Sequence, residues 1–216
     1  TSRDRRGAPV TVASTVGEAA ARFGERPALV ASAGWSVSYA ELHRLSDEVA
    51  AVLAADHGIG EGDLVALVVP SSPDYVVAYA AVAKLGAITA GVNPRATVHE
   101  RNAVLAAARP ALVVVAEPLA ADLPAGLAHV VVAPGTGPDD VLRALRRPDA
   151  PPAPVLADPD EPDRLVTVVF TSGTTGLPKG AMFANAELAA VTRADLGPRA
   201  GEWGGGGPML AGTECA

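Results

Sequence analysis

Short valine-rich runs alternate with segments of helical periodicity over the first 132 residues, and this alternation most constrains the fold. The runs occupy residues 64–69, 111–115 and 130–132. Their almost continuous apolar character is typical of strands that helices cover on both faces. Strands that alternate with helices form parallel sheets. The sequence therefore predicts an α/β fold, with a mostly parallel sheet flanked by helices.

The helices between these runs are marked by their caps. Three capping boxes place a hydroxyl residue three positions before a glutamate, namely Thr15 with Glu18, Ser38 with Glu41, and Thr97 with Glu100. Ser72 and Pro73 mark a fourth start, with Ser72 as the N-cap and Pro73 in the first helical position. Gly58 and Gly86 are expected to end two of these helices.

Two further patterns complete this part of the chain. The runs 28–31 and 35–37 lie close together and predict a small hairpin. The run 76–92 is the most apolar one, but Lys84 lies in its middle. We therefore expect a buried helix that enters a short strand, not a membrane span.

Composition excludes some classes of protein. The chain has 216 residues and is 49% hydrophobic, enough for a packed core. A net charge of −7 and an aromatic content of 4% argue against nucleic-acid binding. Cys215 is the only cysteine, so no disulfide can form within the chain, and no secretory signal is recognisable at the start. These features predict a cytoplasmic protein without a transmembrane segment, and they leave its oligomeric state open.

A proline-rich acidic segment, residues 148–163, predicts a domain boundary. Its six prolines prevent a helix and do not fit a central strand. We expect an α/β subdomain over residues 1–147, a linker over 148–163, and the start of a second subdomain over 164–216. That last part contains one strand at 165–170, predicted to be buried on both faces, and one short helix from Asn185 to about Arg193. Because this is too little to bury a core, a truncated second subdomain is expected.

The loop after strand 165–170 is dense in phosphate-binding groups. Hydroxyl residues and glycines make up most of it: Thr171, Ser172, Gly173, Thr174, Thr175, Gly176 and Gly180. Hydroxyls donate hydrogen bonds, and glycines allow positive φ and a close approach of backbone N–H groups to a ligand. Lys179 follows Pro178 and adds a positive charge, and residues 165–186 contain no Asp or Glu. In an acidic chain this predicts a site for a polyphosphate.

The loop is not a Walker A sequence, because no Gly-Lys-Ser or Gly-Lys-Thr ends it. Residues 171–180, Thr-Ser-Gly-Thr-Thr-Gly-Leu-Pro-Lys-Gly, instead resemble the phosphate loop of the adenylate-forming (AMP-binding) enzymes, which include acyl-CoA synthetases. The resemblance implies the amino-terminal part of that enzyme fold. It also implies a ligase that activates a carboxylic acid, taken to be a fatty acid, with ATP and then transfers the acyl group to coenzyme A.

The resemblance also assigns roles within the loop. Ser172, Gly173, Thr174, Thr175, Gly176 and Lys179 would hold the β- and γ-phosphates of ATP. Thr171 would lie near Mg²⁺, and Thr171 and Lys179 would serve catalysis. Donors arranged in advance stabilise the charge that develops on leaving pyrophosphate. The expected partners are therefore a small carboxylic acid, ATP and CoA.

One departure from the family pattern keeps an alternative open. Family members often carry Thr-His or Ser-His shortly after the loop, where this chain has Ala184 and Asn185. A non-catalytic nucleotide- or phosphate-binding module of the same fold, and an interaction domain that binds no anion, therefore remain alternatives. Nucleotide binding without acyl-adenylate formation would favour the module.

Overall fold

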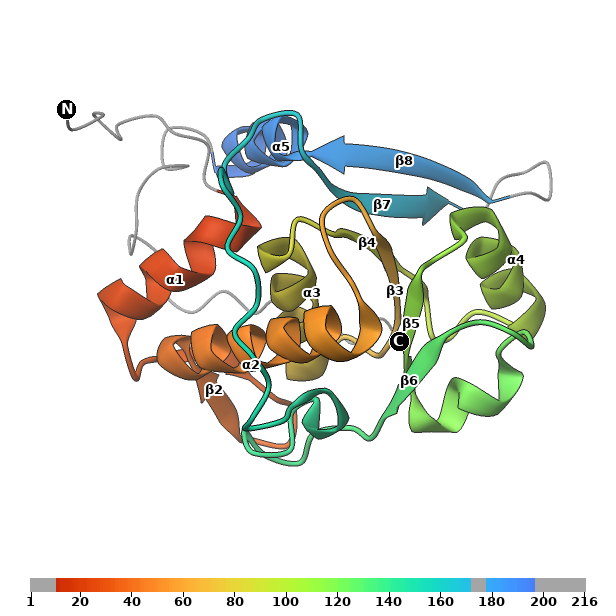
Figure 1. The fold of residues 1–216 in the computed structure, drawn as a ribbon, viewed down its shortest axis with the longest axis horizontal. Coiled ribbons are helices and arrows are strands. Elements are labelled where there is room, and N and C mark those ends of the chain that lie inside the picture. The colour runs from red at the N-terminus through yellow and green to blue at the C-terminus, as the bar shows by residue number, and fades with distance from the viewer. Residues whose placement is uncertain (1–10, 172–177, 197–216) are drawn as a thin grey trace.

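The computed structural model describes residues 11–171 and 178–196 (Figure 1). Its α-helices are α1 (Val12–Phe23), α2 (Tyr39–His57), α3 (Pro73–Lys84), α4 (Val98–Ala108) and α5 (Asn185–Leu196). Its strands are β1 (Pro27–Val30), β2 (Ser36–Ser38), β3 (Leu64–Val68), β4 (Ile88–Gly91), β5 (Leu112–Ala116), β6 (His129–Val132), β7 (Leu165–Thr171) and β8 (Lys179–Ala184). Two short 3₁₀ helices are η1 (Glu117–Asp122) and η2 (Arg143–Leu145). Within the described residues, no helix is both long and apolar enough to cross a membrane.

Six strands form one sheet in the order β6-β5-β3-β4-β7-β8. The five strands from β6 to β7 are parallel, and β8 pairs antiparallel with β7 at the edge. Strands β1 and β2 form the separate hairpin that the sequence predicts. The α/β fold with a mostly parallel sheet is therefore confirmed.

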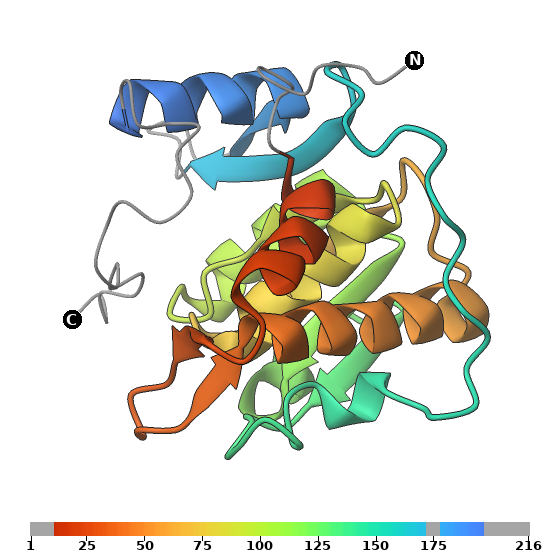
Figure 2. The ribbon, with the colours of Figure 1, turned by 90° about the vertical axis from the view of Figure 1, so that its left-hand side faces the viewer.

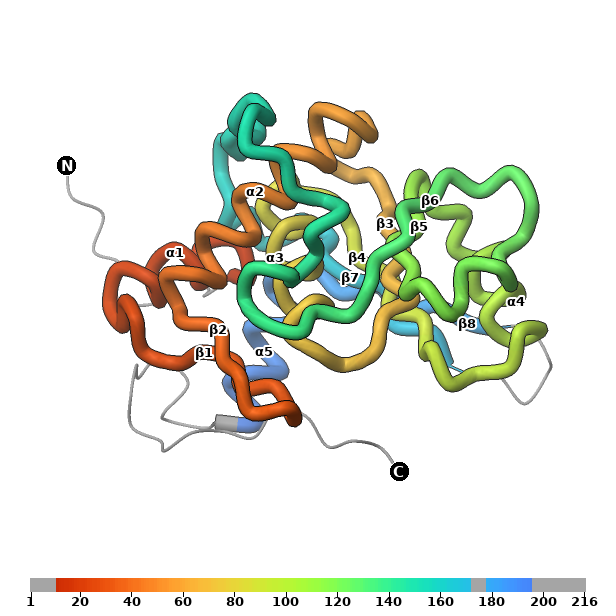
Figure 3. Tube along the Cα trace, turned by 90° about the horizontal axis from the view of Figure 1, so that it is seen from below, coloured from red at the N-terminus to blue at the C-terminus, as the bar shows by residue number. Residues whose placement is uncertain are grey.

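Helices cover both faces of the sheet, as Figure 3 shows for α2 on one side and α4 on the other. The larger core cluster joins α2 and α3 to alternate residues of the strands, such as Val65, Leu67 and Val114. The smaller cluster lies on the opposite face, where Leu105 of α4 packs against Ala66 and other alternate strand residues. Successive side chains of each strand therefore pack into two different cores, one on each face of the sheet, which explains why these strands are apolar throughout.

Two of the three predicted capping boxes are present. Ser38 and Thr97 each accept, on the side-chain oxygen, a hydrogen bond from the backbone N–H of the glutamate three positions later. The carboxylate of that glutamate in turn accepts one from the backbone N–H of the cap residue. The predicted box at Thr15 is wrong, because α1 begins earlier, with Thr11 as its N-cap. The Thr11 hydroxyl accepts a hydrogen bond from the Ser14 amide and donates one to Asp160 at 2.8 Å. A tertiary contact 149 residues away therefore helps to set the start of this helix.

The other predicted helix ends agree with the structure in position. Ser72 is the N-cap of α3 and Pro73 its first residue, although the Ser72 hydroxyl donates to the Asp74 carboxylate and accepts no hydrogen bond from the helix backbone. Gly58 ends α2 in the left-handed conformation at φ 66°. Gly86, at φ 67°, lies two residues beyond the last residue of α3.

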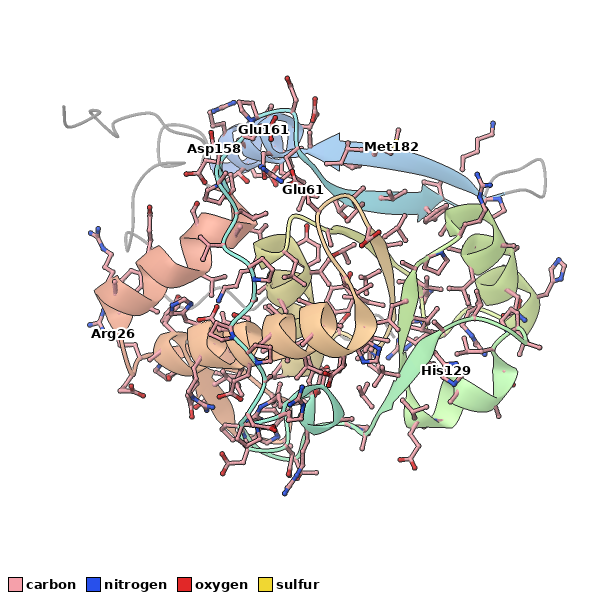
Figure 4. All side chains as sticks on the ribbon, in the orientation of Figure 1. Arg26, Glu61, His129, Asp158, Glu161 and Met182 are labelled. Carbon is pink, nitrogen blue, oxygen red and sulfur yellow. The ribbon has the colours of Figure 1, made fainter. Side chains whose placement is uncertain are left out.

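The proline-rich segment runs across α2 from η2 to the start of β7, as Figures 1 and 2 show, without helix or strand. Ion pairs hold both of its ends. Arg146 pairs with Glu48 of α2 at 2.7 Å, and Arg164 pairs with Glu61 and Glu161. Figure 4 shows Glu61, Asp158 and Glu161 gathered near the start of β7. Beyond this segment β7 joins β4 in the same sheet, and the proposed division into subdomains remains a prediction.

Two expectations about the strand at 165–170 are wrong. Its faces are not both buried, because Val166 and Val168 are buried whereas Val169 is 49% exposed. The sequence also gave no indication of β8, which turns the expected strand-to-loop segment into a β-hairpin. Strand β8 lies at the edge of the sheet and leaves Met182 65% exposed (Figure 4).

Candidate functional site

The candidate site lies at the edge of the sheet where the parallel strands have their carboxyl ends. The connection after β3 runs through α3 on one face, and the connection after β4 runs through α4 on the other. Such a reversal makes the carboxyl ends of β3 and β4 a topological switch point, where α/β sheets bind ligands. Strand β7 lies parallel and next to β4, so its carboxyl end at Thr171 reaches the same edge.

The hairpin register brings two of the predicted site residues together. Thr171 at the end of β7 is directly opposite Lys179 at the start of β8. Residues opposite each other in an antiparallel pair point to the same face of a sheet. Thr171 and Lys179 are therefore neighbours at the base of the loop, although the chain separates them by eight positions. Both are exposed, and the Thr171 hydroxyl lies 3.5 Å from the carbonyl oxygen of Lys179.

The other predicted ligands of phosphate lie outside the described residues. These are Ser172, Gly173, Thr174, Thr175 and Gly176. The structure does place both ends of the segment that contains them, at Thr171 and Pro178. Among the described residues, no carboxylate pairs with the Lys179 ammonium. Within the part of the chain that the structure describes, that charge is not neutralised at this end of the hairpin.

Two tyrosines of α3 pack against the face of the sheet to which Thr171 and Lys179 point. Tyr75 lies over Gly91 at the end of β4. A Cβ atom added to Gly91 would be 2.8 Å from the phenol oxygen of Tyr75. Tyr75 stacks on Tyr79 with ring centroids 6.4 Å apart. Burial raises the pKa of both phenols, so they stay neutral at physiological pH. Val169, the β7 partner of Gly91, shares this face, so an apolar surface adjoins Thr171 and Lys179.

A second polar cluster, centred on Lys84, is separate from this site. Lys84 borders a cavity of about 210 Å³ between α1, α2, α3 and the proline-rich segment. Its ammonium donates to Asp47 at 2.5 Å and to the carbonyl of His43 at 3.0 Å, and it contacts Nδ1 of the His43 ring at 2.9 Å. Burial lowers the pKa of Lys84, and the hydrogen bond that its ammonium donates to Asp47 opposes that effect. Because these partners use all three donors, we interpret the cluster as a clamp between α2 and α3.

Asn185, the position of the departure from the family pattern, has a structural role here. It is 3% exposed, and its amide nitrogen donates to the carbonyl oxygens of Glu161 at 2.8 Å and Pro159 at 3.4 Å. The side chain therefore ties the start of α5 to the proline-rich segment.

Comparison with known proteins matches the sequence of this chain to one family. The model of a family described as "AMP-binding enzyme" matches residues 16–206, most of the chain. The chain belongs to this family. The matched range includes the whole β7–β8 hairpin and its loop.

Family members of known function include CoA ligases. The chain is 36% identical over 177 residues to 4-coumarate–CoA ligase 1 of Oryza sativa subsp. japonica. The aligned region covers 76% of this chain and 31% of that protein. It is 34% identical over 149 residues to the long-chain-fatty-acid–CoA ligase FadD13 of Mycobacterium tuberculosis, which covers 67% of this chain and 29% of FadD13. The chain thus spans about a third of the length of the curated relatives it matches.

Solved structures agree with the fold. The N-terminal subdomain of Klebsiella oxytoca NpsA, in complex with 3-hydroxybenzoyl-AMSN, superposes with a TM-score of 0.68 and 25% identity. That comparison covers 89% of this chain and 45% of the NpsA chain. The mostly parallel sheet is thus the amino-terminal part of the adenylate-forming fold.

Proposed function

We propose that this chain carries the phosphate-binding part of an acid–thiol ligase of the acyl-CoA synthetase type. In the proposed reaction, a carboxylic acid and ATP form an acyl-adenylate, and the thiol of CoA then displaces AMP to give a thioester. One observation carries the proposal, namely the pairing of Thr171 and Lys179 at the base of a loop of hydroxyl residues and glycines. Membership of the AMP-binding family and the CoA ligases among the relatives support it.

The roles of the residues follow from charge. In the first step, a carboxylate oxygen of the acid attacks the α-phosphorus of ATP. The bond between this phosphorus and the oxygen that bridges to the β-phosphate breaks, and pyrophosphate leaves with the electron pair of that bond. Lys179 is exposed and has no carboxylate partner among the described residues, so its ammonium would stabilise the leaving group. The loop residues Ser172, Gly173, Thr174, Thr175 and Gly176 would donate further hydrogen bonds to the β- and γ-phosphates.

Thr171 fits a magnesium ligand at this place. Mg²⁺ commonly takes one or two protein oxygens together with substrate phosphates and water, and the exposed Thr171 hydroxyl supplies one such oxygen. When bound, Mg²⁺ would neutralise charge on the phosphates. Thr171 would then orient the metal beside Lys179.

The substrate is proposed at the level of its class. A fatty acid is the acid that we propose first, while the relatives include a ligase named for 4-coumarate and one named for long-chain fatty acids. Both acids combine a carboxylate with a large apolar group, which suits the apolar surface next to Thr171. Cytoplasmic location is also a proposal, because it rests on the single cysteine.

The test is ATP–pyrophosphate exchange in a protein of the relatives' full length, with fatty and aryl acids offered in turn. Lys179→Met should lower exchange by about a hundredfold or more, as loss of one such charge-stabilising donor typically does. Arg143→Met is the matched control, because Arg143 is an 80% exposed cation on η2. Unchanged exchange in Lys179→Met would refute the role of the lysine.

Two further measurements on the same protein decide between the ligase and the non-catalytic module. Calorimetry with ATP and with pyrophosphate measures binding, and mass spectrometry detects acyl-adenylate. Binding without acyl-adenylate for any acid would favour the module, and the absence of anion binding would favour an interaction domain.

A further inference from the structure

Gly180 has a different role from the one that the sequence predicts. The sequence places it in the loop as a glycine that allows positive φ. In the structure it is the second residue of β8, and it is not among the described glycines with positive φ. Any residue could adopt the backbone conformation of Gly180, so backbone conformation does not explain why glycine is at this position.

That reason is space. A Cβ atom on Gly180 would lie 2.7 Å from Cγ1 of Val168 and 3.1 Å from Cε1 of Phe170. Real Cβ atoms essentially never approach other heavy atoms more closely than 3.0 Å. The register pairs Phe170 with Gly180, so the ring lies against the bare backbone of β8. A side chain at position 180 would push the two strands apart or displace the side chains of Val168 and Phe170.

Phe170 is held in turn by the core. Its ring packs against the cluster on the α4 face of the sheet, which includes Ala90 of β4 and Leu105 of α4. Val168, the other neighbour of Gly180, is 7% exposed. The β8 backbone at Gly180 therefore rests on side chains that packing keeps in place.

This contact lies one residue from the proposed phosphate ligands. Phe170 directly precedes Thr171, and Gly180 directly follows Lys179. Because side chains alternate along a strand, Phe170 and Gly180 occupy one face while Thr171 and Lys179 share the other. A shift of β8 at Gly180 would thus move Lys179 relative to Thr171.

We propose that Phe170 and Gly180 form a positioning pair, in which the core-anchored ring against the bare glycine sets Lys179 beside Thr171 for binding of a di- or triphosphate. The proposal rests on the function proposed above and adds two residues to it. Neither residue touches the ligand, since both lie on the opposite face from Lys179. The ring is the connection between the core of the sheet and the phosphate site.

The experiment compares Gly180→Ala, Val168→Ala and the double variant, with inorganic pyrophosphate as the probe in calorimetry and urea unfolding as the measure of folding. Gly180→Ala should weaken binding at least about tenfold, the order of one hydrogen bond to a charged group. Val168→Ala removes the nearest atom, so the double variant should bind within about threefold of Val168→Ala alone. Gly137→Ala is the matched control, because a Cβ there would meet nothing within 4 Å and its φ is not positive.

Each outcome gives a decision. If the wild-type chain binds no pyrophosphate, the proposed function fails and the positioning role fails with it. If the wild type binds and Gly180→Ala binds equally well, only the positioning pair is refuted. A folded Gly180→Ala with weak binding that Val168→Ala does not restore also refutes it. If Gly180→Ala does not fold, recovery of both folding and binding in the double variant supports the pair, and no recovery overturns it.

Discussion

Glu48 of α2 is bound by two arginines that differ in burial, and this difference gives a sharp prediction. Arg146, just before the proline-rich segment, donates to it at 2.7 Å and has a side chain that is 15% exposed. Arg44 donates to it at 2.6 Å from one helical turn away and is 48% exposed. Double-mutant cycles that combine Glu48→Ala with a change of either arginine compare the coupling energies of the two pairs, which share the Glu48 carboxylate.

The expected coupling energies follow from exposure. The Arg44 pair is an exposed i, i+4 pair and should couple by about 0.3–0.5 kcal/mol. The Arg146 pair is less screened, but the carboxylate is still 33% exposed, so we expect roughly 1–2 kcal/mol after discounting for solvent. Urea unfolding of the single and double variants measures both values. Equal couplings, or a larger one for Arg44, would refute the reasoning.

The pH dependence tests the same pairs. Burial raises the pKa of Glu48, but the hydrogen bonds and charges of Arg146 and Arg44 outweigh it, so the pKa lies below its ordinary value of 4.5. A carboxyl group with a lowered folded-state pKa stabilises the fold above the unfolded value, and this contribution is lost as the pH falls through the folded value. The coupling to Arg146 should therefore be full at about pH 7 and shrink below about pH 4.5. A coupling that is constant over this range would contradict the charge origin.

Two further predictions concern the core and a buried carboxylate. Leu45→Ala should cost about 2–5 kcal/mol in urea unfolding, because Leu45 is fully buried. Val155→Ala, at a 95% exposed side chain, should stay within about 0.5 kcal/mol. Asp74→Ala should cost about 1–3 kcal/mol, since the Gly135 and Leu142 amides would lose their acceptor, and faster amide exchange at both positions would show it. Unchanged exchange there would contradict that role.

The elements with local signals were predicted well. The capping boxes at Ser38 and Thr97, the left-handed Gly58 and the valine-rich strands each depend on residues within one turn or one strand. The start of α1 was missed because Thr11 also binds Asp160 across the fold. The cluster of Lys84 with His43 and Asp47 was missed for the same reason, since α2 and α3 meet only in the folded chain.

The candidate site was predicted by composition and not by geometry. The density of hydroxyl residues and glycines, with Lys179, was enough to predict a phosphate loop. Strand β8 was missed, because the segment 179–184 shows no clear alternation and lies at an edge, where residues 179–182 are exposed on both faces. Without β8, the proximity of Thr171 and Lys179 could not be derived.

The amino-acid sequence by itself determined the order of the α-helices and strands as far as β7, the chemistry of the loop and the family resemblance, because these depend on neighbouring residues. The tertiary structure alone decided that Thr171 faces Lys179, and that Gly180 must lack a side chain because Val168 and Phe170 lie against it. Strand pairing and side-chain packing set these contacts. Their register is a property of the assembled sheet, so no local pattern in the chain specifies it.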